Sequence, residues 1–98
     1  MELLTENLWM IEEEGLITLG LTAELQDEAG DISYANIASL GNIDVDDTVL
    51  NIEASKAAIE VASPITGKIV ERNDKAEDNP SLLNSTDATE NWIVKIQK

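Results

Sequence analysis

The sequence contains no cysteine and no histidine among its 98 residues. The lack of cysteine excludes disulfide bonds, thiolate nucleophiles and zinc–thiolate sites, and it is compatible with a reducing compartment. The lack of histidine removes the usual general base and the commonest metal ligand. Ser–His–Asp and Cys–His arrangements are therefore impossible, and we expect a protein that is not an enzyme by itself.

Basic residues are also scarce. Six Lys and Arg residues stand against twenty Asp and Glu residues, which gives a formal net charge of −14. Nucleic acids and anionic membranes both select basic surfaces, so neither is expected as a partner. No hydrophobic run approaches the length of a membrane-spanning helix, and the acidic N-terminus lacks the basic flank of a signal peptide. We therefore expect an acidic, cytoplasmic protein that meets basic partner surfaces.

Aromatic residues make up only 3% of the chain, so the core must be aliphatic. Short alternating segments punctuated by Gly, Pro, Asn and Asp predict many short strands, and one short helix is expected between Thr22, an N-cap candidate, and Gly30. Strict alternation would place Ile32 on the same face as Tyr34. The expected fold is a single all-β domain over residues 1–98, acting as a monomer. We expect strands at 8–11, 16–21, 31–37, 48–53, 59–61, 68–73 and 92–96, turns at 12–15 and 41–42, a helical turn at 80–84, and polar loops at 74–79 and 85–91.

One lysine stands apart from the other basic residues. Residues 1–55 contain thirteen Asp or Glu and no Lys or Arg, and the other five basic residues lie at or after Lys68. Lys56 follows the alternating strand at 48–53, precedes a second alternating segment and is flanked by small residues. This pattern predicts a tight hairpin with Lys56 at its tip, clear of its neighbours. Lys56 is then either an ordinary exposed lysine or an amine for covalent attachment of a carrier cofactor such as lipoate or biotin.

Acidic residues offer two other interpretations. Asp44, Asp46 and Asp47 suggest a calcium loop, but the sixth position of that loop is Val49 instead of Gly and the twelfth is Ser55 instead of Glu. These acids are therefore expected to be solvated, and no metal site is expected. A chain with twenty Asp and Glu residues always contains some carboxylates that could act as a pair. A freestanding hydrolase with paired carboxylates therefore stays as a further hypothesis, although the sequence has no aromatic platform for a sugar.

Several motifs in a fixed order connect the Lys56 hairpin to a known family. Glu53-Ala54-Ser55-Lys56-Ala57 corresponds to a Glu-Ser-Val-Lys-Ala motif, and with the other motifs it makes the chain resemble the H protein of the glycine cleavage system, a lipoyl carrier, over residues 9–96. The other matching stretches are Gly-Leu-Thr at 20–22, Gly-Asp at 30–31, Ser-Pro-Ile-Thr-Gly-Lys-Ile-Val at 63–70, Glu-Asp-Asn-Pro-Ser-Leu-Leu-Asn at 77–84 and Trp-Ile-Val-Lys-Ile at 92–96.

The resemblance implies a flattened β-barrel of two sheets, the barrel-sandwich hybrid of lipoyl and biotinyl carriers, with lipoate amide-linked to Lys56. Biotin carriers usually flank their lysine with methionine, whereas Ser55 and Ala57 fit a lipoyl carrier better. A disulfide on a flexible arm exchanges electrons or groups and visits several partner enzymes at high effective concentration. A lipoate–protein ligase is the first partner implied, and Glu53 and Glu60 are candidates for orienting it.

Two departures from the family pattern bear on function. The family usually has a Glu before the first-strand Trp and often a His early in the short helix, and these groups are implied to hold the aminomethyl-loaded arm; this chain has Leu8 and Glu24 there. The departures favour the H-like branch of some Gram-positive bacteria. The resemblance then implies a redox carrier served by dihydrolipoamide dehydrogenase, a sirtuin-type ADP-ribosyltransferase and a macrodomain hydrolase.

Asp27 matches the acid that is modified by ADP-ribosylation in that branch, although an ordinary exposed helix acid would look the same. The first alternative is an aminomethyl shuttle that works with glycine decarboxylase and aminomethyltransferase. The second alternative is a protein-interaction module whose lysine carries no cofactor.

Overall fold

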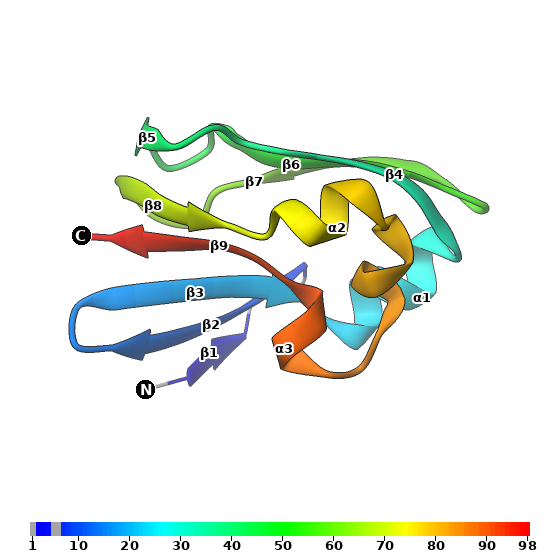
Figure 1. Ribbon diagram of the computed structural model, residues 1–98, viewed down its shortest axis with the longest axis horizontal. Helices are drawn as coiled ribbons and strands as arrows, with labels where there is room; N and C mark the ends of the chain where they lie inside the picture. Colours follow the sequence, from blue (N-terminus) through cyan, green and yellow to red (C-terminus); the bar gives the residue numbers. More distant parts are fainter. Residues whose placement is uncertain (1, 5–6) are drawn as a thin grey trace.

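The computed structural model describes residues 2–4 and 7–98, which form two antiparallel sheets with short helices at one end (Figure 1). The larger sheet has the strand order β1-β2-β3-β9-β8-β5, and the smaller sheet has the order β4-β6-β7. The mostly-β, two-sheet architecture expected from the sequence is therefore confirmed. The strands are β1 (Glu2–Leu4), β2 (Leu8–Glu13), β3 (Leu16–Leu21), β4 (Ile32–Ile37), β5 (Gly41–Ile43), β6 (Thr48–Ala54), β7 (Ala58–Ala62), β8 (Gly67–Arg72) and β9 (Trp92–Gln97).

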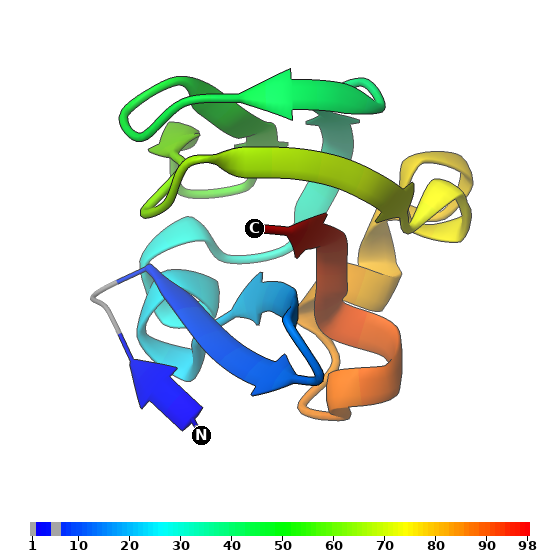
Figure 2. The same cartoon turned by 90° about the vertical axis from the view of Figure 1, so that its left-hand side faces the viewer.

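The core lies between the two sheets, which face each other when the molecule is viewed along its length (Figure 2). It is aliphatic because the sequence offers almost no aromatic residues. Trp9 instead lies against Gly20, where an added Cβ would collide with the indole ring. The largest fully buried side chains are Leu8, Leu19, Leu21, Leu25, Leu50, Ile52, Ile69, Leu83, Ile93, Ile96, Val49 and Val61.

The expected short helix is α1 (Ala23–Ala29). Thr22 caps it as predicted, because its Oγ1 accepts a hydrogen bond from Leu25 N at 3.2 Å. Gly30 ends the helix with a positive φ of 80°, which glycine adopts without steric cost. Leu25 and Ala29 are completely buried, so one face of α1 closes the end of the core.

Two other short helices occupy segments that were predicted to be polar loops. α2 (Asp74–Asp78) buries Ala76, and α3 (Ala88–Asn91) is capped by Asp87, whose carboxylate accepts from Thr89 N at 2.9 Å. The hydrogen bonds from the Thr89 side chain and backbone lower the pKa of Asp87 below its usual value. The predicted helical turn is confirmed as the 3-10 helix η1 (Pro80–Asn84).

Three further predictions about strands were wrong or incomplete. Residues 41–42, expected to form a turn, belong to the short strand β5, which pairs with β8. β1 was not expected. A register shift between Ile32 and Tyr34 breaks the alternation of β4, so Ile32 is buried while Tyr34 is 51% exposed. A bulge of this kind moves the side chains on one side of it to the opposite face.

Side chains close the outer edge of β4. Glu77 Oε2 accepts from Ile37 N at 2.8 Å, and the Arg72 guanidinium donates to Ile37 O at 2.8 Å. The two charged groups also pair with each other at 2.7 Å. Farther along the strand, Asn84 Oδ1 accepts from Ile32 N at 2.8 Å. These contacts satisfy edge groups that would otherwise be available to another strand.

Candidate functional site

The predicted hairpin around Lys56 is present. β6 and β7 pair in antiparallel register, and Ala54 N donates to Ala57 O at 3.0 Å across the turn. Ser55 and Lys56 form the tip, and both are exposed. The small neighbours Ser55 and Ala57 leave the lysine side chain accessible.

The tip does not stand clear of its neighbours, which corrects that part of the prediction. Lys56 N donates to Ala29 O at 2.9 Å, and Ser55 N donates to Asp31 O at 2.9 Å. Ser55 Oγ in turn accepts from Asp31 N at 3.0 Å. The last carbonyls of a helix lack partners within the helix, and the hairpin supplies donors to them. The hairpin and the C-terminal end of α1 therefore form one unit, which we call the tip–helix junction (residues 27–31 and 55–56).

Gly30 makes this junction possible. A Cβ at this position would collide with Ser55 Oγ and would lie 3.0 Å from Lys56 Cγ. The lysine side chain thus runs directly over the glycine. Lys56 Nζ reaches Asp27 O, to which it donates at 3.2 Å. A cation beside the C-terminal end of a helix is favourable, because the carbonyl dipoles point toward it.

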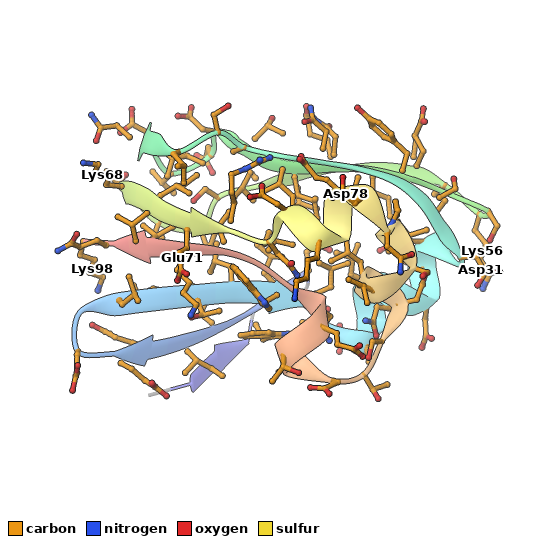
Figure 3. The ribbon with its side chains drawn as sticks, in the orientation of Figure 1. Asp31, Lys56, Lys68, Glu71, Asp78 and Lys98 are labelled. Carbon is orange, nitrogen blue, oxygen red and sulfur yellow. The ribbon has the colours of Figure 1, made fainter. Side chains whose placement is uncertain are left out.

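The amine of Lys56 stays reachable in this arrangement. Its residue is exposed, and none of the ion pairs between described residues involves it. Lys56 and Asp31 lie together at one extremity of the molecule, whereas Lys68 and Lys98 lie at the other (Figure 3). The structure also brings the two predicted site residues into contact, since Lys56 Nζ touches the backbone of Asp27 while the Asp27 residue is exposed.

Beside the N-terminal half of α1 lies an open cleft of about 430 Å³. Trp9 forms part of its wall, and Trp9 Nε1 donates to Asn91 Oδ1 at 3.1 Å. Among the described residues that line it, Glu24 alone has a charged side chain. Leu8, the other departure from the family pattern, is 1% exposed in the core and does not line the cleft. The lining residues are Trp9, Ile11, Leu21, Thr22, Ala23, Glu24, Gln26, Thr86, Ala88 and Asn91.

The acids at 44–47 have a structural role in a turn. Asp47 Oδ2 accepts from Asp44 N at 2.9 Å. Across residues 2–4 and 7–98, no group of three or more Asp or Glu side chains converges as a metal site would require. Within the same residues, no helix has the length and apolar character needed to cross a membrane.

Comparison with known proteins agrees with these features. The sequence profile of the family described as glycine cleavage H-protein matches residues 2–98. The chain belongs to the glycine cleavage H-protein family. Proteins of this family are non-catalytic lipoyl carriers, so the expected carrier class is confirmed.

Individual relatives in the family cover most of the chain. A glycine cleavage system H-like protein of Staphylococcus aureus is 42% identical over 96 residues, which are 98% of this chain and 87% of the relative. A glycine cleavage system H protein of Psychrobacter is 36% identical over 91% of this chain and 72% of its own length. The crystal structure of an H protein from Mycobacterium marinum superposes with a TM-score of 0.85 over 98% of this chain and 81% of that one, at 19% identity. This structural likeness shows the shared fold.

The sequence did not reveal the tip–helix junction. Its contacts join residues 24 to 29 positions apart through backbone atoms, the Ser55 hydroxyl and the Lys56 ammonium, and no side-chain pattern marks such contacts. The one available signal was the pair Gly30-Asp31 after the helix, which belongs to the family motifs and lies in contact with Ser55.

Proposed function

We propose that this protein is a lipoyl carrier in which lipoate is amide-linked to Lys56. The observation that supports this most is an exposed lysine amine in the two-residue loop of a hairpin. Its neighbours are small, and the hairpin lies at one extremity of this chain, which belongs to a family of lipoyl carriers. When bound, the lipoyl group supplies a disulfide that accepts and releases electrons or a transferred group. The protein presents the arm and holds its base rigidly through the tip–helix junction.

Within the family, we propose that this chain is an H-like redox carrier, with dihydrolipoamide dehydrogenase as the enzyme that reoxidises it. The 42% identical relative from Staphylococcus aureus bears the H-like name. The buried Leu8 also offers no carboxylate to the cleft, which weakens the case for a loaded amine being held there. We further propose that residues 1–98 act as a single-domain, cytoplasmic monomer.

Asp27 is proposed as a site of ADP-ribosylation by a sirtuin-type transferase, reversed by a macrodomain hydrolase. Its residue is exposed on α1, and its backbone carbonyl accepts from Lys56 Nζ at 3.2 Å. A bulky group on Asp27 would lie beside the base of the lipoyl arm and would hinder enzymes that approach Lys56. This proximity supports control of the carrier through Asp27.

A second candidate function is the aminomethyl shuttle of the glycine cleavage system. It is favoured by Glu24, because a carboxylate lining the cleft can pair with an amine, and by the glycine cleavage names of several relatives.

Glycine loading distinguishes the two functions. We expect the dihydrolipoyl form of this protein to be reoxidised to the disulfide by dihydrolipoamide dehydrogenase, with NAD⁺ as the two-electron acceptor. We expect the lipoylated protein to gain no aminomethyl group when it is incubated with glycine decarboxylase and glycine, as measured by intact mass. A lipoylated glycine cleavage H protein serves as the positive control. Robust glycine-dependent loading of this protein would establish the shuttle and overturn the redox assignment.

A further inference from the structure

We propose that β7 is the docking strand for the lipoate ligase, which adds an extended segment of its own to the outer edge of this strand. The proposal rests on the proposed lipoylation of Lys56. The surface that the ligase contacts is the outer edge of β7, and the groups that the ligase binds are backbone N–H and C=O groups of this strand.

The register of the hairpin determines which backbone groups of β7 point outward. In an antiparallel pair, consecutive residues alternate between bonding to the partner strand and pointing away from it. Ala54 N bonds to Ala57 O at one end of the pair, and Ser63 N bonds to Asp47 O at the other end. Residues 57, 59, 61 and 63 thus face β6. The N–H and C=O groups of Ala58, Glu60 and Ala62 face away from it.

These outward groups are unoccupied within the described part of the chain. β7 pairs with β6 alone and forms one end of the smaller sheet. Ala58, Glu60 and Ala62 are all exposed, and no other described residue bonds to their outward N–H or C=O groups. The other end of the same sheet is closed at β4 by Glu77, Arg72 and Asn84, as described above. One edge of the sheet is blocked, and the open edge is the one that adjoins Lys56.

The side chains on this edge suit the approach of a partner strand. The side chains of Ala58 and Ala62 are small and stand roughly perpendicular to the sheet, so they do not obstruct another backbone in its plane at about 4.8 Å, the spacing of paired strands. Glu60 lies between them and calls for a basic residue opposite. A second copy of this chain fits poorly, because antiparallel pairing of two β7 strands would bring two Glu60 residues together on molecules of net charge −14.

The edge is also within reach of the reacting amine. Ala58 follows Lys56 by two residues, which is about 7 Å along an extended chain. Strand addition at β7 would therefore fix the hairpin tip relative to the enzyme while leaving the lysine side chain outside the pairing. Such backbone pairing gives affinity without requiring a particular side chain at each position.

Amide-resolved hydrogen exchange tests the proposal. Exchange of wild-type protein is measured by NMR alone and with saturating lipoate–protein ligase, lipoate being omitted. We expect at least about tenfold slower exchange of the outward amides of Ala58, Glu60 and Ala62 in the complex. The outward-pointing amides of β5, which ends the larger sheet, serve as the internal control and should not change.

A pair of variants at one position gives an independent measurement. Glu60→Pro removes the outward N–H without removing a bond to β6, a position at which edge strands tolerate proline, whereas Glu60→Gln removes only the charge. We expect Glu60→Pro to raise the KM of the ligase for the unmodified protein by about tenfold, the effect of one lost hydrogen bond. Glu60→Gln should raise it about twofold to threefold, as rim charges do. Thermal melts verify that both variants fold.

Three results would overturn the proposal. The first is a ligase that acylates Lys56 while the exchange of the three amides stays as in the free protein. The second is protection of these amides in the free protein that rises with its concentration, which would assign the edge to a second copy. The third is a failure of the ligase to acylate wild-type Lys56, which would overturn the proposed function as well.

Discussion

Lys56 has two bonding roles that a solvated surface lysine lacks. Its backbone N–H closes the C-terminal end of α1 at Ala29 O, and its ammonium donates to Asp27 O. The first bond persists whatever the side chain carries. The second involves an exposed group, and acylation would replace the charged amine by a neutral amide with a single N–H. The backbone can therefore hold the hairpin in place while the side chain is released to a modifying enzyme.

Replacing this side chain should affect function and leave the fold intact. We expect Lys56→Ala to change the free energy of unfolding by no more than about 0.5 kcal/mol, the usual range for exposed sites, and to abolish lipoylation. Urea denaturation measures the first effect and ligase assays the second. Lys68→Ala, an exposed lysine at the other end of the molecule, is the control and should leave both unchanged. A loss of stability above about 2 kcal/mol in Lys56→Ala would instead make the amine a structural group.

At the scale of elements, the junction between α1 and the β6–β7 hairpin explains why the functional lysine is both exposed and well placed. A helix that ends in a glycine with positive φ leaves room for Ser55 and Lys56 directly over its last turn. Neither element could be moved without breaking the bonds between Ser55 and Asp31. The base of the proposed arm therefore has a fixed position relative to Asp27.

Gly15 and Gly30 both have a φ of 80°, but the ψ of −153° at Gly30 lies in a region that essentially only glycine adopts, so Gly30 is held by its backbone conformation as well as by its packing. Gly15 has open space around it, whereas a Cβ at Gly30 would collide with Ser55 Oγ. We expect Gly15→Ala to cost about 1 kcal/mol, the price of positive φ in alanine, and Gly30→Ala to cost at least about 1 kcal/mol more. Urea denaturation measures both losses. Equal losses in the two variants would contradict the interlocked junction.

The sequence predicted α1, the Lys56 hairpin and all described strands except β1 and β5, because alternation, caps and turn residues are local signals. It missed α2 and α3 because helices of five and four residues are too short for periodicity to show, and they depend on caps and on one buried alanine, Ala76. The placement of Ile32 and Tyr34 on opposite faces was missed because a bulge has no sequence pattern of its own. Lys56 could be identified from the sequence as the candidate residue, but its contacts with the end of α1 depend on tertiary structure and could not be predicted.

At the scale of the whole molecule, the two ends differ in the charged residues that they present. Lys56 lies beside the acidic residues Asp27 and Asp31 at one extremity, while Lys68 and Lys98 lie at the other (Figure 3). A ligase with a basic surface would be attracted toward the Lys56 end, and such steering weakens as salt rises. The open edge of β7 begins at that same end, two residues after Lys56.

The central claim is that Lys56 carries lipoate, and intact-mass spectrometry tests it most directly. The protein is produced with a lipoate–protein ligase in lipoate-fed cells, beside Lys56→Arg, which keeps the positive charge. We expect one lipoyl adduct on the wild type, assigned to Lys56 by peptide mapping, and none on Lys56→Arg. A wild-type chain of unmodified mass, or an adduct that persists in Lys56→Arg, would contradict the account.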